Sequence, residues 1–223
     1  GEKEESAIYR VKFDDDTIAE ARALIYTAGA YPRKAGVPGE DEYTGKGVSY
    51  CAICDGAFYK DKTVAVIGGG DTALGDAMHL SRMAKKVYLV HRRQEFRANQ
   101  ALQTAVQQNA AIELVLDAVP TAVLGENRVD HLELLQNGTS KTLPVDGVFV
   151  AIGSIPNTDF LGDLCKLDES GYILADETGV TTTPGVFAAG DVRTTPLRQV
   201  VTAVADGANC VQSIEQYFRK GNG

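Results

Sequence analysis

The stretch VAVIGGGDTA, residues 64–73, decides how the middle of this chain is expected to fold. An apolar run typical of a buried strand ends in three glycines, and a segment with apolar residues at helical spacing follows. The pattern is Gly68-x-Gly70-x-x-Ala73, whose glycines permit a tight turn and a close approach of the backbone to a pyrophosphate. The stretch therefore predicts a strand, turn and helix that bind a dinucleotide, and the alternative is a tight turn that binds no ligand.

The following segments extend this unit into half of a doubly wound sheet. KVYLV, residues 86–90, indicates a second buried strand, a helix is expected over about residues 94–109, and IELVL, residues 112–116, indicates a third strand. Short strands of an antiparallel ribbon that returns into a final strand are expected at 120–126, 129–136 and 143–153, with a hairpin turn at Asn137-Gly138.

The flanking segments carry a different pattern. Residues 23–26 read as a strand that ends in a turn of small residues, and the Pro/Gly-rich residues 32–39 after it are typical of a domain hinge. Near the other end, GVFAAGD, residues 185–191, predicts a strand and turn, and a long helix is expected over about residues 197–218.

The segment HRRQEFR, residues 91–97, follows the second strand of the predicted dinucleotide unit. An NAD-binding unit places an acid near this point, about 20 residues after the glycines, to bind the ribose hydroxyls. Here Arg92, Arg93 and Arg97 can instead surround a 2′-phosphate, which an acid would repel. The segment favours NADPH over NADH, and the alternative is an ordinary solvated basic face.

The pair Cys51 and Cys54 in CAICDG has three possible interpretations. A zinc site needs two more ligands, and the remaining cysteines and histidines form no second pair, so no metal is expected. Two inert core thiols are the second interpretation. The third is a redox disulfide, since CxxC spacing allows a small reducible ring and Asp55 places a proton donor beside Cys54. A disulfide accepts the two electrons of a hydride readily only through an intermediary such as a flavin, so this interpretation requires a flavin site.

The composition excludes several classes of protein. The formal net charge of -8 argues against nucleic acid or an anionic membrane as the main partner. No apolar run reaches the roughly 18 to 20 residues that a membrane span needs. Four cysteines in 223 residues, two of them isolated, do not form the framework of a secreted protein, and a cytoplasmic location is expected.

Taken in order, CAICDGAFYKDKTVAVIGGGDTA, HRRQEFRA, VFVAIGSIPNT, GVFAAGDV and RQVVTAVADG closely resemble the low-molecular-weight bacterial thioredoxin reductases. The resemblance runs through almost the whole chain. It implies an α/β fold of two Rossmann-like dinucleotide-binding domains of the three-layer ββα type. Residues 33–155 are expected to form an NADPH-binding domain that carries the CxxC pair, and residues 1–32 and 156–223 to form pieces of an FAD-binding domain.

The resemblance also implies a function for these domains. Such enzymes, usually homodimers, pass electrons from NADPH to FAD, to the CxxC disulfide and to thioredoxin, and their NADPH domain rotates between two orientations. By this likeness Cys54 faces the flavin, Cys51 reacts with thioredoxin, and Asp55 protonates the departing thiolate. Contacts with NADPH are expected at Gly68, Gly70, Asp71, Thr72, Ala73, His91, Arg92, Arg93, Arg97, Ile152 and Gly153. Contacts with FAD are expected at Thr27, Ala28, Gly29, Gly190, Asp191, Arg198, Gln199 and Val200.

One departure from the family pattern leaves other functions open. The chain holds a single strand-GxGxxG-helix, whereas the resemblance calls for another that binds the ADP half of FAD, so the FAD domain is expected to be incomplete here. One alternative is therefore an NADPH-binding module without turnover. Another is a related flavoprotein that serves a peroxiredoxin-type partner.

Overall fold

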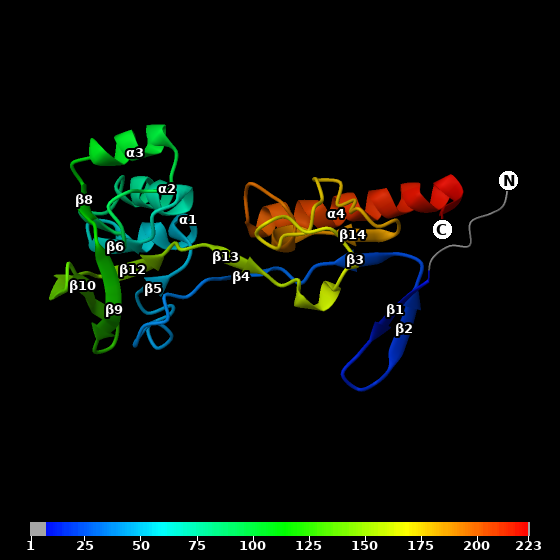
Figure 1. Cartoon of the computed structure of the whole chain (residues 1–223), viewed down its shortest axis with the longest axis horizontal. Helices are drawn as coiled ribbons and strands as arrows, with labels where there is room; N and C mark the ends of the chain where they lie inside the picture. The colour runs from blue at the N-terminus through cyan, green and yellow to red at the C-terminus, as the bar shows by residue number, and fades with distance from the viewer. Residues whose placement is uncertain (1–7, 223) are drawn as a thin grey trace. The chain divides into compact units, whose positions relative to one another are not determined.

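The computed structural model describes residues 8–222, so the expectation for residues 1–7 lies outside the described part. The chain divides into two compact units, which are described separately. Unit 1 consists of Gly1–Tyr31 and Ser154–Gly223, and unit 2 of Pro32–Gly153 (Figure 1). The assignment of FAD to residues 1–32 and 156–223, and of NADPH to residues 33–155, stays a prediction.

Unit 2 is built on a five-stranded sheet in which every pair of neighbouring strands is parallel. In spatial order its strands are β5 (Val48–Ser49), β12 (Gly147–Val150), β6 (Thr63–Ile67), β7 (Lys86–Val90) and β8 (Ile112–Val115). The predicted strand, turn, helix and second strand are all present, and the α/β class is confirmed.

Helices and a second sheet cover the two faces of this sheet, which gives unit 2 three layers (Figure 1). The helical layer holds α1 (Ala52–Asp55), the 3₁₀ turn Gly56–Tyr59, α2 (Asp71–Leu80) and α3 (Gln100–Gln107). The second sheet is antiparallel and consists of β9 (Ala118–Gly125), β10 (Val129–Gln136) and β11 (Thr139–Pro144). Asn137 and Gly138 form the predicted hairpin turn, both with positive φ, between β10 and β11.

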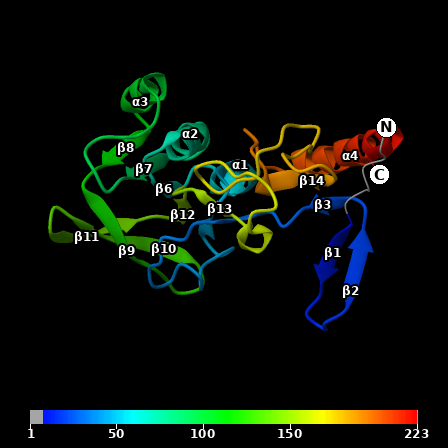
Figure 2. The same cartoon turned by 45° about the vertical axis from the view of Figure 1, so that its right-hand side comes forward.

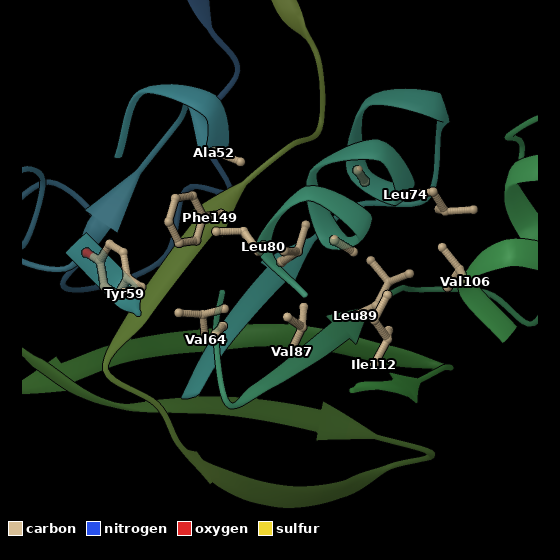
Figure 3. Close-up of a cluster of buried hydrophobic side chains, with 14 of the residues drawn as sticks. Ala52, Tyr59, Val64, Leu74, Leu80, Val87, Leu89, Val106, Ile112 and Phe149 are labelled. Atoms are coloured by element: carbon tan, nitrogen blue, oxygen red, sulfur yellow. The ribbon is translucent and has the colours of Figure 1, made fainter. Parts of the chain in front are cut away.

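Alternating side chains of the central strands pack into two separate hydrophobic cores, one on each face of the sheet. Val64 and Val66 of β6 pack against the helices, as Figure 3 shows for Val64, whereas Ala65 and Ile67 pack against the antiparallel sheet. Because successive side chains of a strand point to opposite faces, a strand covered on both faces is apolar throughout. This explains why the run before the glycines shows no alternation with polar residues.

The predicted helix over residues 94–109 is wrong at its start. Helix α3 begins at Gln100, after Asn99, whose side chain accepts a hydrogen bond from the Leu102 N–H at 2.9 Å. Asparagine at this position satisfies an N–H that the helix leaves free, and so it ends the preceding loop rather than continuing a helix. Residues 92–98 therefore form a loop.

The described residues of unit 1 form pairs of short strands, the last of which reaches its boundary with unit 2, and a long helix (Figure 2). Strand β1 (Tyr9–Lys12) pairs with β2 (Ile18–Ala21), β3 (Leu24–Tyr26) with β14 (Val186–Ala188), and β4 (Ala30–Pro32) with β13 (Ser154–Pro156). The helix α4 (Val200–Tyr217) lies along β14 and continues into a π-helical turn, Phe218–Asn222, while 3₁₀ turns occur at Asp159–Leu161 and Gly190–Val192. The predicted strands at 23–26 and 185–191 and the long helix are confirmed.

Helix α4 is covered by unit 1 along only part of its surface. Within the described residues its buried side chains are Asp206 and Cys210, while Val200, Val201 and Val204 are exposed.

No helix within residues 8–222 is long and apolar enough to cross a membrane.

Candidate functional site

The two cysteines of CAICDG form a disulfide at the start of helix α1. Cys51 is the residue that precedes the helix, with an extended backbone, and its Sγ accepts a hydrogen bond from the Cys54 N–H at 3.2 Å. A separation of three residues across one helical turn places the two Cα atoms 5.3 Å apart, within the range for a disulfide. Cys51 is partly buried and Cys54 is exposed, so the bond is accessible.

Asp55, the residue after Cys54, receives a hydrogen bond from a residue that the sequence analysis did not predict as part of the site. Its Oδ2 accepts a 2.7 Å hydrogen bond from the hydroxyl of Ser49, the last residue of β5. The same hydroxyl oxygen accepts from the Cys51 N–H at 3.1 Å. Ser49 therefore links the backbone of the first cysteine to the carboxylate of the acid. Its position at a strand end two residues before a CxxC was the available signal.

Two exposed apolar side chains lie in the same segment as the disulfide. Ile53, between the cysteines, is 60% exposed, and Phe58 is 73% exposed. Exposed apolar groups at a reactive bond are typical of a surface that contacts another macromolecule.

The glycine turn between β6 and α2 combines a crowded position with an open one. Gly68 has φ +153°, and a Cβ there would lie 2.4 Å from the carbonyl oxygen of Ala151. No atom lies within 4 Å of the Cβ position of Gly70, which leaves space over the turn. Asp71 and Thr72, at the exposed start of the ten-residue helix α2, and the buried Ala73 follow. A helix start of this kind offers free N–H groups to an anion.

Hydrogen bonds fasten the arginine loop to this turn. The Arg97 N–H donates to the Gly69 carbonyl at 2.8 Å. Oδ1 of Asp71 accepts from both the backbone N–H of Asn99, at 2.9 Å, and its side-chain amide, at 2.7 Å. The carboxylate of Asp71, predicted to contact the cofactor, thus holds the far end of the loop.

The arginines of the loop carry unmatched charge. The side chains of Arg92, Arg93 and Arg97 are exposed, and within residues 8–222 none of them forms an ion pair. Three guanidinium groups in one loop next to a helix start are suited to a multiply charged anion such as a phosphate monoester.

His91 lies beneath the turn rather than among the arginines. Its ring is buried at 6% exposure, stacks on Phe96 with the ring centres 5.2 Å apart, and lies with Nε2 3.1 Å from the Glu95 carbonyl. A Cβ on Gly69 would lie only 2.1 Å from Cε1 of this ring. Burial, followed by the nearby arginines, lowers the pKa of His91, so the imidazole is neutral at neutral pH. Direct contact between His91 and a phosphate stays a prediction.

The end of β12 approaches the same turn, because Ala151 is in contact with Gly68. Ile152 and Gly153 follow, the first partly buried and the second exposed with φ +105°. The Gly153 carbonyl accepts a hydrogen bond from the Arg33 N–H at 2.9 Å.

In unit 1 the candidate residues for FAD gather at the ends of two neighbouring parallel strands. Thr27, Ala28 and Gly29 follow β3, and Gly29 has φ +69°. Gly190 and Asp191 follow β14, which pairs with β3. Carboxyl ends of parallel strands are where α/β sheets bind ligands.

The start of α4 holds the remaining candidates of unit 1. Gln199 caps the helix in a reciprocal pair of hydrogen bonds with Thr202. The Arg198 guanidinium lies 4.1 Å from the ring centre of Tyr172, and its Nε donates weakly to the Asp191 carbonyl at 3.4 Å. Val200 is 82% exposed. Arg198 is therefore held against the turn that contains Asp191.

The chain matches the family model described as pyridine nucleotide-disulphide oxidoreductase over residues 2–207. The chain belongs to this family. Thioredoxin reductases are among its relatives: that of Listeria innocua is 43% identical over 204 residues, covering 90% of this chain and 64% of that protein. The thioredoxin reductase of Bacillus subtilis is 42% identical over 204 residues, covering 90% of this chain and 65% of that protein. The chain thus spans about 64% of the length of such curated relatives.

Solved structures give the same result. The thioredoxin reductase of Streptococcus pyogenes superposes with a TM-score of 0.85 at 38% identity, covering 96% of this chain and 74% of that one. The thioredoxin reductase of Giardia duodenalis superposes with a TM-score of 0.86 at 36% identity, covering 93% and 69%. The resemblance read from the sequence is confirmed.

The structure also contains a buried ion pair that was not predicted from the sequence. Arg193 and Asp206, each 6% exposed at the side chain, are joined by two hydrogen bonds of 2.7 and 2.5 Å. Oδ2 of Asp206 also accepts from the Gly190 N–H at 2.9 Å. The pair therefore fastens the turn after β14 to helix α4. Two charged residues 13 positions apart carry no local signal that they meet.

Other features of the family member lie away from these sites. A groove of about 580 Å³ in unit 1, between residues 177–187 and α4, is lined by none of the predicted site residues. Among the described residues, no three His, Cys, Asp or Glu side chains gather as a metal site. Cys165 and Cys210 are buried free thiols.

Proposed function

We propose that the protein to which this chain belongs is an NADPH-dependent, FAD-containing thioredoxin-disulfide reductase. Electrons pass from NADPH through FAD to the Cys51–Cys54 disulfide and on to thioredoxin. One observation carries the proposal: a single compact unit holds both an accessible CxxC disulfide and an open glycine turn beside unpaired arginines. Family membership and the similarity to thioredoxin reductases support it.

The nucleotide proposed for unit 2 is NADPH. Open space over Gly70 and the free N–H groups at the start of α2 suit a pyrophosphate. The exposed arginines suit a 2′-phosphate, and the three positions directly after β7 hold His91, Arg92 and Arg93 instead of an acid that would bind ribose hydroxyls. The residues present therefore fit NADPH.

The residues of unit 1 fit part of an FAD site. Gly29 and Gly190 have positive φ at the ends of adjacent strands. The backbone N–H groups of the first turn of α4 follow directly after Gln199. FAD, when bound, accepts a hydride from NADPH and passes two electrons to a disulfide. In this proposal Thr27–Gly29 and Gly190–Asp191 bind the cofactor, and Arg198 to Val200 place a helix start where negative charge is stabilised.

The disulfide residues have separate proposed roles. Cys54 receives the electrons and Cys51 exchanges with thioredoxin, while Asp55 supplies a proton to the departing thiolate. The exposed Ile53 and Phe58 support an apolar contact with a protein acceptor.

A homodimer and a cytoplasmic location complete the proposal. The cytoplasmic location is supported by the two free cysteines, which fit a reducing compartment.

The test uses the full-length protein loaded with FAD. NADPH oxidation should match the appearance of thioredoxin thiols, and Cys54→Ser should abolish it. NADH should be a poorer donor by at least about 100-fold, because two charge-assisted hydrogen bonds to the 2′-phosphate contribute about 3 kcal/mol or more. Thioredoxin reduction that survives Cys54→Ser contradicts the mechanism.

Two further measurements separate the alternatives. Tight NADPH binding without turnover by the FAD-loaded protein would favour a nucleotide-binding module. Faster turnover with purified peroxiredoxin than with thioredoxin would change the acceptor. A visible spectrum of the 223-residue chain after adding FAD shows whether this chain binds flavin, and we expect weak binding.

A further inference from the structure

The hydroxyl of Ser49 is the meeting point of the hydrogen bonds around the disulfide. The side chain belongs to a residue that is only 5% exposed, on the two-residue strand β5 at the edge of the parallel sheet. Its neighbour in sequence, Val48, is buried in the apolar core. A buried hydroxyl in this place is costly unless its hydrogen bonds are made, and here they are.

The distances show which way the single Ser49 proton points. The Asp55 Oδ2 atom lies 2.7 Å from Oγ, and the Cys51 carbonyl oxygen lies 3.4 Å away. The proton therefore goes to the carboxylate, while Oγ accepts from the Cys51 N–H.

The same hydroxyl can serve both protonation states of Asp55. When Asp55 is a carboxylate, Ser49 donates to it. When Asp55 is a carboxylic acid, the hydroxyl can turn its proton toward the Cys51 carbonyl and accept from the acid instead. A lysine or a backbone N–H in this place could only donate.

We propose that Ser49 is a positioning residue that holds the carboxyl group of Asp55 toward the Cys51–Cys54 disulfide in both of its protonation states. The inference rests on the proposed role of Asp55 as proton donor. In the step concerned, an incoming thiolate bonds to one sulfur, the S–S bond breaks, and its electron pair stays on the other sulfur. That sulfur takes the Asp55 proton and leaves Asp55 as the carboxylate that Ser49 stabilises.

The test follows reduction of the disulfide in the 223-residue chain by dithiothreitol, with no NADPH or FAD present. Asp55→Asn should slow the reaction by about 100-fold, the lower end of general acid catalysis. Ser49→Ala should slow it by about tenfold, because a catalytic group without its support loses part of its effect. Ser49→Thr, which keeps the hydroxyl, should restore the rate to within about threefold of the original.

A double-mutant cycle separates positioning from a merely structural effect. If Ser49 acts through Asp55, the double variant reacts as Asp55→Asn does, within about twofold. Effects that multiply, or a Ser49→Ala rate equal to that of the original chain, overturn the proposal.

Ser81→Ala is the matched control. Ser81 lies in the same unit, and its hydroxyl also donates one bond, to the Met78 carbonyl, and accepts one, from Asn109. We expect a loss of thermal stability similar to that of Ser49→Ala with an unchanged reduction rate, and an equal slowing would contradict the inference. Because no nucleotide or flavin takes part, a failed thioredoxin assay does not affect this result, nor does this result affect that assay.

Discussion

The two units of this chain differ in how their parallel strands are covered. In unit 2, five parallel strands lie between helices and an antiparallel sheet, and two cores fill the gaps. In unit 1, β3 and β14 form a two-stranded parallel sheet beside α4, whose valines at its start are exposed. Parallel sheets are ordinarily buried on both faces. The parallel sheet of unit 2 is covered in this way, whereas that of unit 1 has less covering structure.

This difference indicates that the more stable unit is also the one that carries the disulfide and the candidate nucleotide site. Unit 2 combines the larger core with the disulfide, the glycine turn and the arginine loop. Unit 1 relies on a smaller core and on the buried Arg193–Asp206 ion pair. We therefore expect the two units to unfold in separate steps, with unit 2 the more stable.

The largest effect is expected for Phe149→Ala. Phe149 is 1% exposed and packs edge-to-face on Tyr59 with the ring centres 5.1 Å apart (Figure 3). Its loss should cost unit 2 about 3–5 kcal/mol through lost transfer energy and a cavity. Urea titration followed by hydrogen exchange of peptides from each unit measures the change. Phe187→Ala is the matched variant of unit 1, and an equal loss of protection in unit 2 would show that the units unfold together.

As the pH falls, unit 1 should lose stability before unit 2 does, because Asp206 becomes protonated. Burial alone raises the pKa of this carboxyl, but the hydrogen bonds from Arg193 and the Gly190 N–H outweigh burial and hold it below its ordinary value. The unfolded chain therefore binds the proton more tightly, so this stabilisation is present above about pH 4 and is lost as the pH falls further. Asp206→Ala leaves Arg193 buried without its partner and should cost unit 1 about 3 kcal/mol at neutral pH. A uniform acid transition by hydrogen exchange in both units would contradict this expectation.

NADPH should sharpen the contrast by stabilising unit 2 alone. At a concentration 100 times its dissociation constant, a ligand adds about 2.7 kcal/mol to the stability of the unit that binds it. Arg97→Ala should weaken NADPH by about tenfold to thirtyfold and leave NADH unchanged, because the lost contact is to the 2′-phosphate. Calorimetric titration measures both, with the exposed Arg82→Ala of the same unit as control. Equal weakening of NADH would place Arg97 elsewhere on the cofactor.

The smallest effect concerns Asp76 on α2. Burial raises the pKa of this carboxyl to about 6, above its ordinary value. The folded state therefore prefers the protonated acid, and stability falls as the pH rises through about 6. Asp76→Asn should stabilise unit 2 by about 1–2 kcal/mol at pH 7 and by almost nothing near pH 4. The exposed Asp163→Asn of unit 1 should change stability by under about 0.5 kcal/mol, and a pH-independent gain for Asp76→Asn would contradict the assignment.

The order of strands and helices in unit 2 could be read from the sequence because its signals are local. The apolar run of β6, the glycines after it and Asn137-Gly138 each act within a few residues. The early start predicted for α3 failed because the helix begins only after a capping residue, Asn99, whose own bonds to Asp71 fix where the loop ends.

The sequence by itself determined the α/β class, the family resemblance, the CxxC pair and the arginines that favour NADPH. Only the tertiary structure decided which side chains support them: Ser49 under Asp55, His91 under Gly69, Asp71 on Asn99 and Asp206 on Arg193. The physical reason is that strand and turn patterns are encoded by neighbours along the chain, whereas hydrogen-bond partners meet only when strand order and register bring distant segments together.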